Sequence, residues 1–311
     1  MRRTAALTVA ALLPLALATA CGSGPANTPS AAGSSALAAA AQDVVSAVPK
    51  SDAVAALLPE EVRKAGTLRL GGSSGTPPSA FYPDPAVKKA AGLDVDFTDA
   101  VAKVLGIRIE REEAAFETIL PALDSGKYDL GTGNFGVTTA RLKTIDFVTY
   151  INDGQGFAVK KDDTARQPVK EIADLCGLTI GTGVGTTFET TLNAKKNVCT
   201  DAGKKAYEVR AYSDSGATLT SLQQGKVDLV MSTINGLRHQ AANPASGTRF
   251  LSEFRRLDVG FAFKKGSPLT PAFQGAVNQL IQDGTYAKIL AKWGTTESAV
   301  PKSEISPPER P

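Results

Sequence analysis

Residues 119–147, "ILPALDSGKYDLGTGNFGVTTARLKTIDF", contain the pattern that decides the fold. A helical run ends at Gly126, and the strand "YDLGTG" (128–133) follows directly. A Gly- and Thr-rich turn then leads to a single arginine, Arg141. This turn predicts either a surface helix capped by Thr138 or Thr139, or an anion site in which backbone N–H groups and the Arg141 guanidinium hold one carboxylate.

Strand and helix signals alternate on both sides of this segment. Strands are expected at 67–72 and 107–112 around an amphipathic helix at 94–106, and the pattern restarts with a strand at 156–161. Further strands are expected at 178–183, 207–213, 227–233 and 259–266, and further helices at 169–177, 184–192, 217–225 and 234–242, with two more between Thr270 and Trp293. This alternation predicts an α/β fold with a mostly parallel sheet in two lobes. Ligands in such sheets bind beyond the carboxyl ends of the strands.

The N-terminus has the composition of an export signal. Arg2 and Arg3 precede an apolar stretch, and "ATA" precedes Cys21, which predicts a signal peptide at 1–20. The same pattern resembles a bacterial lipobox, in which Cys21 would receive a lipid. The alternative is an ordinary cleavage site that leaves Cys21 as a free thiol. Residues 21–61 begin with small, nearly uncharged residues and are predicted to form a flexible, lipid-anchored linker.

Charge and cysteine content limit the possible partners. The formal charge falls from +3 to +1 when Arg2 and Arg3 are removed with the signal peptide, which gives no reason to expect nucleic acid binding. In an exported protein Cys176 and Cys199 are expected to form a disulfide, the alternative being two buried thiols. His239, the only histidine, has no metal-ligand spacing around it, so neither a metal nor another cofactor is expected.

The sequence has none of the common catalytic motifs. It contains no G-x-S-x-G elbow, no phosphate-binding P-loop and no H-E-x-x-H helix. Catalysis would have to rest on carboxylates such as Glu117, Asp153 or Glu189. Backbone N–H clusters, one arginine and aromatic residues suit the binding of a small zwitterion or carboxylate better than its conversion.

Five segments, at 92–106, 119–147, 175–187, 222–232 and 284–294, resemble in order and spacing the extracytoplasmic solute-binding proteins of the polar amino acid type (family 3), which serve ABC importers. The resemblance implies two α/β lobes joined by two hinge strands in a periplasmic-binding-protein-like fold. Lobe 1 would comprise 62–152 plus 258–311, and lobe 2 would comprise 156–256. A monomer is expected, with an ABC transporter permease as its partner. Its location would be extracytoplasmic, on the cell membrane through the lipid, or secreted or periplasmic without it.

The resemblance also implies roles for particular residues. Arg141 would bind the ligand α-carboxylate with N–H groups of Asn134 to Gly136 beside it, and Phe116 would contact the ligand side chain. Gly185 and Thr186 would cover the ligand from lobe 2. Thr233 stands where the family usually has an Asp for the ligand ammonium group, and Ser79 stands where an aromatic residue is common.

The function implied is that of a receptor for a small polar carboxylate, an amino acid or a derivative, rather than an enzyme. The alternative is a dehydratase-like enzyme of the same fold, which would need a carboxylic acid of raised pKa in the cleft.

Overall fold

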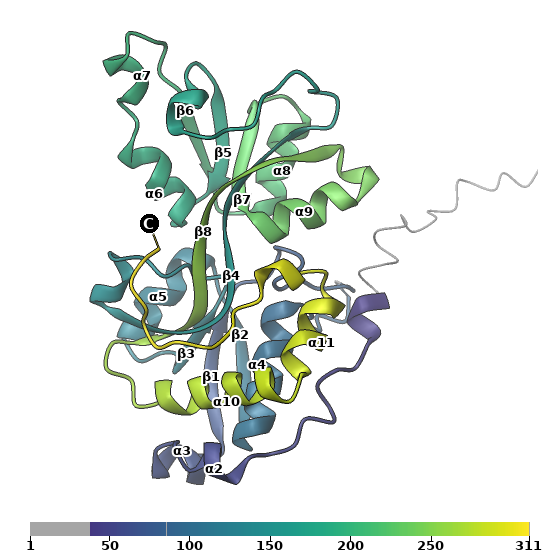
Figure 1. The fold of residues 1–311 in the computed structure, drawn as a ribbon, viewed down its shortest axis with the longest axis vertical. Coiled ribbons are helices and arrows are strands. Elements are labelled where there is room, and N and C mark those ends of the chain that lie inside the picture. The colour runs from purple at the N-terminus through teal and green to yellow at the C-terminus, as the bar shows by residue number, and fades with distance from the viewer. Residues whose placement is uncertain (1–37, 85, 311) are drawn as a thin grey trace, which may run out of the picture.

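The computed structural model describes residues 38–84 and 86–310 (Figure 1). The predicted signal peptide and Cys21 lie outside the described residues. The strands are β1 (Thr67–Gly72), β2 (Arg108–Glu113), β3 (Leu130–Thr132), β4 (Ile145–Lys160), β5 (Thr179–Gly183), β6 (Glu208–Tyr212), β7 (Leu229–Thr233) and β8 (Thr248–Lys264). The α-helices are α2 (Asp52–Ala55), α3 (Glu60–Ala65), α4 (Leu93–Leu105), α5 (Phe116–Asp124), α6 (Thr187–Ala194), α7 (Val198–Asp201), α8 (Ser215–Gln223), α9 (Ile234–Ala242), α10 (Thr270–Gln282) and α11 (Thr285–Lys292). Short 3₁₀ helices are η1 (Arg141–Lys143), η2 (Ile172–Leu175), η3 (Pro244–Ser246) and η4 (Thr296–Ser298).

Two long strands connect the two lobes of this α/β fold. The described strands form one sheet in the order β2-β1-β3-β8-β4-β7-β5-β6, with β8 and β4 at its centre. β4 has 16 residues and β8 has 17, and they run side by side from one lobe into the other (Figure 1). The sequence pattern predicted strands only at 156–161 and 259–266, which are the last part of β4 and the last part of β8. The missed halves contain polar residues and Gly154, which interrupt the strand signal.

The expectation of a mostly parallel sheet is wrong for the centre of the sheet. β1 pairs in parallel with β2 and β3, and β5 pairs in parallel with β6 and β7. The strands that cross between the lobes pair antiparallel, β4 with β7 and β8, and β8 with β3. The parallel strands therefore belong to the lobes, and the antiparallel pairs join them.

Aromatic residues dominate the core of the first lobe. The Phe97 and Tyr150 rings lie 5.3 Å apart, and Tyr150 lies 4.6 Å from Phe261, measured between ring centroids. These rings come from α4, β4 and β8, so burying them fastens the helix layer onto the crossing strands. The second lobe has a separate cluster around Phe157, Leu192 and Met231.

The predicted linker at 21–61 differs from the structure in its last part. Val48, Ala55 and Leu58 are buried, and the Ser51 N–H donates to the Val104 carbonyl of α4 at 2.9 Å. These apolar residues follow an Ala-rich stretch that has no clear periodicity, which is why the sequence did not separate them from the linker. Residues 48–58 therefore belong to the packed first lobe.

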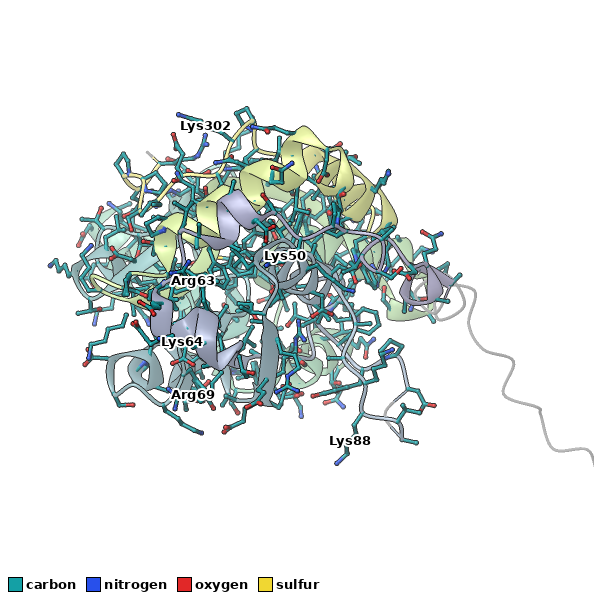
Figure 2. All side chains as sticks on the ribbon, turned by 90° about the horizontal axis from the view of Figure 1, so that it is seen from below. Lys50, Arg63, Lys64, Arg69, Lys88 and Lys302 are labelled. Carbon is teal, nitrogen blue, oxygen red and sulfur yellow. A yellow bond between two sulfur atoms is a disulfide. The ribbon has the colours of Figure 1, made fainter. Side chains whose placement is uncertain are left out.

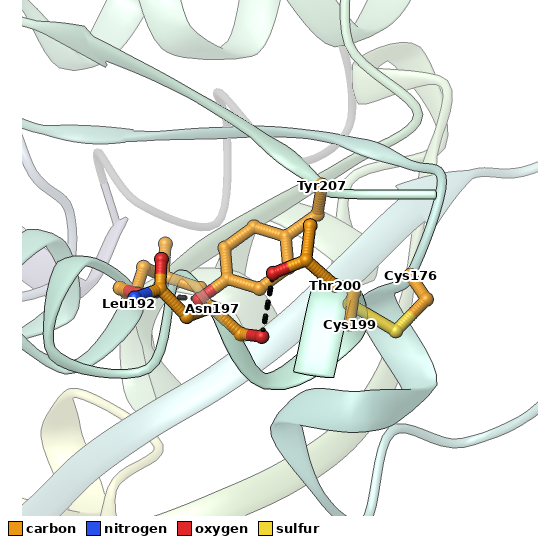
Figure 3. The surroundings of a disulfide bond; sticks show 6 residues. All are labelled: Cys176, Leu192, Asn197, Cys199, Thr200 and Tyr207. Carbon is orange, nitrogen blue, oxygen red and sulfur yellow. Dashed lines mark hydrogen bonds between the residues drawn. A yellow bond between two sulfur atoms is a disulfide. The ribbon is translucent and has the colours of Figure 1, made fainter. Parts of the chain in front are cut away.

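The predicted disulfide is confirmed. Cys176 and Cys199 are bonded, with their Cα atoms 5.5 Å apart (Figure 3). Cys176 follows η2, and Cys199 lies in α7, a short helix that the sequence pattern did not predict. Beside the bond the Tyr207 hydroxyl donates to the Leu192 carbonyl, which ties the end of α6 to the start of the next strand.

Candidate ligand-binding site

A cavity of about 160 Å³ lies between the two lobes. This is well above the roughly 15 Å³ that a cavity needs to hold one water, so it has room for a small molecule. Five predicted site residues line it: Phe116, Asn134, Arg141, Thr186 and Thr233. Gly136 and Gly185 are not among the lining residues, but each contributes a carbonyl group to Arg141.

Arg141 is held by both lobes. Its Nη1 donates to the Gly136 carbonyl at 3.0 Å, and its Nη2 donates across the cleft to the Gly185 carbonyl at 3.3 Å. A guanidinium has five N–H donors, so these two bonds leave capacity for a further acceptor. Burial lowers the pKa of the Arg141 guanidinium to about 10, which keeps it positively charged at neutral pH.

The turn before Arg141 is tighter than the predicted surface helix. Arg141 begins a three-residue 3₁₀ helix, and its N–H donates to Thr138 Oγ1 at 3.3 Å. The N-cap of this helix is Ala140, so the expected cap at Thr138 or Thr139 is wrong. The Thr139 N–H donates to Glu309 instead. Arg141 follows β3 by only a short turn, which brings its side chain to the carboxyl end of that strand.

Two aromatic rings support the guanidinium. Phe116 and Phe135 stack with their centroids 4.8 Å apart, and Arg141 Cζ lies 5.9 Å and 5.7 Å from the two centroids. A flat guanidinium packs well on aromatic faces, and such contacts contribute about 0.5–1 kcal/mol or more when shielded from water. Phe116 thus shapes the cavity and also helps to hold Arg141.

The loop of the second lobe approaches the first lobe closely at Gly185. Its φ is +71°, and a Cβ built there would lie 2.8 Å from Glu117 Cβ. The Gly185 N–H donates to Glu189 Oε2 at 2.7 Å, and Thr186 Oγ1 accepts from the Glu189 N–H at 3.2 Å. Glycine at 185 therefore allows the two lobes to meet beside Arg141.

Thr233 is the N-cap of α9. Its Oγ1 accepts from the Gly236 N–H at 3.0 Å, so the hydroxyl has a structural role at the cavity wall.

Charged lining residues of the described chain are Arg141, Glu117 and Asp214, and Asp214 caps α8 through the Ala217 N–H at 2.7 Å. Hydroxyl groups make up much of the remaining polar lining: Ser73, Ser74, Thr76, Ser79, Thr186, Thr187, Ser213, Ser215, Thr218, Ser232 and Thr233.

Asn134 separates the cavity from two buried carboxyl groups. It has a φ of +57°, its N–H donates to Asp94 Oδ2 at 3.2 Å, and its Nδ2 donates to Asp153 Oδ2 at 3.0 Å. Burial raises the pKa of both Asp94 and Asp153 to about 6, although hydrogen bonds from Tyr150 to Asp94 and from the Asn235 N–H to Asp153 oppose the shift. The backbone N–H of Asn134, expected to bind an anion, is therefore already engaged.

Sequence reasoning missed three residues around the cavity. Asp94 belongs to the quoted segment 92–106 but carried no predicted role, and Asp214 lies just beyond β6. Ser79 was noted only as a departure, yet its hydroxyl accepts from Asn134 Nδ2 at 3.3 Å. The rule that ligands bind at the carboxyl ends of strands could have drawn attention to Asp214.

Within residues 38–84 and 86–310, no group of three or more His, Cys, Asp or Glu side chains could hold a metal ion. No helix in that part of the chain is both long and apolar enough to cross a bilayer.

A family profile and individual relatives both identify the chain as similar to solute-binding proteins. The profile of the bacterial extracellular solute-binding proteins, family 3, matches residues 68–296. The arginine-binding protein ArgT of Corynebacterium glutamicum is 27% identical over 259 residues, covering 81% of this chain and 82% of that protein. The L-cystine-binding protein TcyJ of Escherichia coli K12 is 29% identical over 236 residues, covering 75% and 84%.

Solved structures agree with this relation. An ancestral arginine-binding protein bound to arginine is 33% identical, with a TM-score of 0.65, covering 73% of this chain and 98% of its own. An ancestral amino acid-binding protein described as a precursor of cyclohexadienyl dehydratase is 28% identical with the same TM-score, covering 75% of this chain and 98% of its own. The chain belongs to the bacterial extracellular solute-binding proteins of family 3, and its role is that of a solute receptor.

Proposed function

We propose that this receptor binds a small carboxylate, an amino acid or a derivative, between its lobes and delivers it to an ABC transporter permease. The observation that carries the proposal is the Arg141 guanidinium, which contacts a carbonyl of each lobe inside a cavity of suitable size. A ligand carboxylate at this position would accept two parallel bonds from the guanidinium, an arrangement that a lysine could not provide.

The other charged lining residues suit a ligand that also carries positive charge. Glu117 and Asp214 are the acidic residues of the lining, so its three charged side chains sum to one negative charge. An amino acid with a cationic group would balance this charge, whereas a simple dicarboxylate would be repelled. L-Arginine, L-cystine and L-histidine are the first probes, because proteins similar to this chain are named for binding them.

Titration calorimetry with this panel tests the proposal. Arg141→Ala should lower the affinity for the best ligand tenfold to over a hundredfold, because a charge-assisted pair contributes about 1.5–3 kcal/mol or more in a shielded site. Arg63→Ala is the matched control, because Arg63 is exposed on α3 and does not line the cavity (Figure 2). Equal affinities of the two variants would reject Arg141 as the carboxylate site.

We further propose that the protein is not an enzyme. Asp94 and Asp153, whose pKa values are raised to about 6, are buried behind Asn134 and are not among the lining residues. A general acid must reach the reacting atoms, so this position does not support dehydration of a ligand in the cavity. Turnover of a cyclohexadienyl carboxylic acid by the purified protein, lost in Asp153→Asn, would overturn this part of the proposal.

The proposed setting is extracytoplasmic. Lipid attachment at Cys21 would anchor a monomeric receptor near its permease, with lobe 1 at 62–152 plus 258–311 and lobe 2 at 156–256. Fractionation of cells that produce the full chain and a Cys21→Ser variant tests the anchor. The native protein should remain with the membrane and the variant should be released.

A further inference from the structure

The polar, Pro-rich segment Ala299–Arg310, called here the C-terminal strap, is fastened to the first half of β4. The Thr149 N–H donates to the Glu304 carbonyl at 3.0 Å, and the Ser306 N–H donates to the Phe147 carbonyl at 2.8 Å. Val148 and Ile305 form an isolated antiparallel bridge between these bonds. The strap, yellow in Figure 1, therefore runs beside a strand that connects the two lobes.

Near its end the strap reaches the turn that carries Arg141. Glu309 Oε2 accepts from the Thr139 N–H at 2.7 Å, two residues before Arg141. The other carboxylate oxygen, Glu309 Oε1, lies 2.9 Å from Arg255 Nη2 on β8. One carboxylate thus joins the Arg141 turn to a crossing strand.

Arg310, the next residue, binds the strap to β8 at a position where β8 pairs with β4. Arg310 Nε donates to Asp258 Oδ2 at 2.8 Å, and Asp258 Oδ1 accepts from Asn152 Nδ2 at 3.1 Å. Asn152 and Asp258 are register partners in β4 and β8. The Arg310 carbonyl also accepts from Arg255 Nη2. The end of the strap therefore contacts β8 and the Arg141 turn directly, and β4 through Asp258.

These contacts are more sheltered than an ordinary surface ion pair. The side chains of Glu309 and Asp258 are 21% and 8% exposed, against 42% and 69% for the Glu304–Lys302 pair earlier in the strap. Burial raises the pKa of Glu309, but the Thr139 hydrogen bonds and the Arg255 charge outweigh it, so the pKa lies below its usual range. A carboxylate bonded to a backbone N–H makes a strong, charge-assisted hydrogen bond.

We propose that Glu309 is a positioning residue for ligand binding: it holds the Thr138–Arg141 turn against β8 so that the Arg141 guanidinium is set for the ligand carboxylate. The inference rests on the proposed function of Arg141. A binding group must be held within about 0.5 Å of its productive position by the residues around it. The 2.7 Å bond from the Thr139 N–H to Glu309 supplies such a restraint two residues before Arg141. Loosening the turn should mainly raise the dissociation rate of the ligand. The association rate should change little, because Arg141 can still meet the ligand carboxylate.

The test compares Glu309→Gln with Glu304→Gln, the same change at a half-exposed strap position whose side chain pairs with Lys302 at 2.8 Å. Lys302 is labelled in Figure 2. Amide hydrogen exchange over residues 136–145 should become about tenfold faster in Glu309→Gln and stay unchanged in Glu304→Gln. Unchanged exchange in Glu309→Gln would overturn the positioning role, whether or not the ligand is known.

Binding of L-arginine, or of the tightest amino acid in the panel, supplies the second readout. Glu309→Gln should weaken binding about fivefold, mostly through a faster release rate, and Glu304→Gln should not. In an Arg141→Lys background the same Glu309→Gln change should cost less than twofold, because the geometry it protects is already lost. Equal losses in both backgrounds would overturn the action through Arg141.

The two readouts separate this inference from the function on which it rests. If no amino acid or related carboxylate binds the native protein, the proposed function fails, and hydrogen exchange alone decides whether Glu309 holds the turn. If the native protein binds and faster exchange leaves the affinity unchanged, the function stands and the coupling of the strap to binding is rejected.

Discussion

Asn134 Nδ2 donates to Asp153 Oδ2 at 3.0 Å, which connects a residue of the cavity wall with a carboxylate buried in the crossing strand β4. Because a carboxylate only accepts hydrogen bonds, this contact fixes the orientation of the Asn134 amide. Two carboxyl groups, Asp153 and Asp94, thereby lie directly behind the site at a point where the chain passes between the lobes.

This pair predicts a pH-dependent term in stability. Burial raises the pKa of each carboxyl from 3.8 to about 6, so the folded protein binds more protons than the unfolded chain between these values. The stabilising contribution is present below pH 4 and is lost as the pH rises through 6. Asp153→Asn should therefore flatten the fall in unfolding free energy between pH 4 and pH 7 by about 3 kcal/mol.

Urea unfolding at three pH values within this range checks the prediction. His239, whose pKa is lowered by burial, contributes with the opposite sign, but it is present in both proteins and cancels in the difference. Parallel curves for the native protein and Asp153→Asn would contradict a raised pKa at Asp153.

Thr233→Asp should favour ligands that carry an α-ammonium group. Aspartate is as good an N-cap as threonine, so α9 should keep its start. A carboxylate at this lining position would gain a charge-assisted bond and should tighten α-amino acids about tenfold. Thr233→Asn is the neutral control, and calorimetry with an amino acid and its deamino analogue measures the effect. Equal changes for both ligands would show that the ammonium group is bound elsewhere.

Removing the disulfide should destabilise the second lobe. Cys176 and Cys199 are separated by 23 residues, and a cross-link of that span contributes roughly 3 kcal/mol in the chain-entropy description. The double substitution Cys176→Ala with Cys199→Ala should lower the unfolding free energy by about this amount and remove the effect of added reductant. If reductant does not change the urea midpoint of the native protein, the bond contributes little.

Gly154→Ala should disturb the pairing of β4 with β8. Gly154 has a φ of +153°, and a Cβ there would lie 2.1 Å from the Arg255 carbonyl oxygen. Backbone must move to relieve this clash, so a loss of about 3 kcal/mol or more is expected. Gly126→Ala is the control, because it also has positive φ but has nothing within 4 Å of the added carbon. Thermal unfolding should show a clearly lower midpoint for Gly154→Ala than for Gly126→Ala.

The parts of the fold that sequence predicted are those with a strong local signal. α4 buries Phe97, Val101 and Leu105 at helical spacing, and Gly106 ends it in the left-handed conformation. For the turn at Arg141 the sequence left two alternatives, and the structure has a short 3₁₀ helix there in place of the predicted surface helix. A segment such as α4 can be predicted from sequence because its own residues are enough to determine its structure.

The rest depended on contacts between distant residues. The polar first half of β8 is a strand because β4 pairs with it, and Asp153 can be buried because Asn134 and the Asn235 N–H bind it. The strap is a polar, Pro-rich segment, yet Ser303 is buried and Glu309 reaches Thr139, 170 residues earlier in the chain. No local pattern distinguishes a polar segment that meets such partners from one that does not.

The packing of residues 48–58 has a mechanical consequence. Val48 and Leu58 are buried in the aromatic core of the first lobe, so a pulling force applied to the chain before Val48 acts first on that lobe. The chain passes from the first lobe to the second through β4 and β8. Attachment of the N-terminal segment to a surface would thus hold the first lobe directly, and the second lobe only through the first.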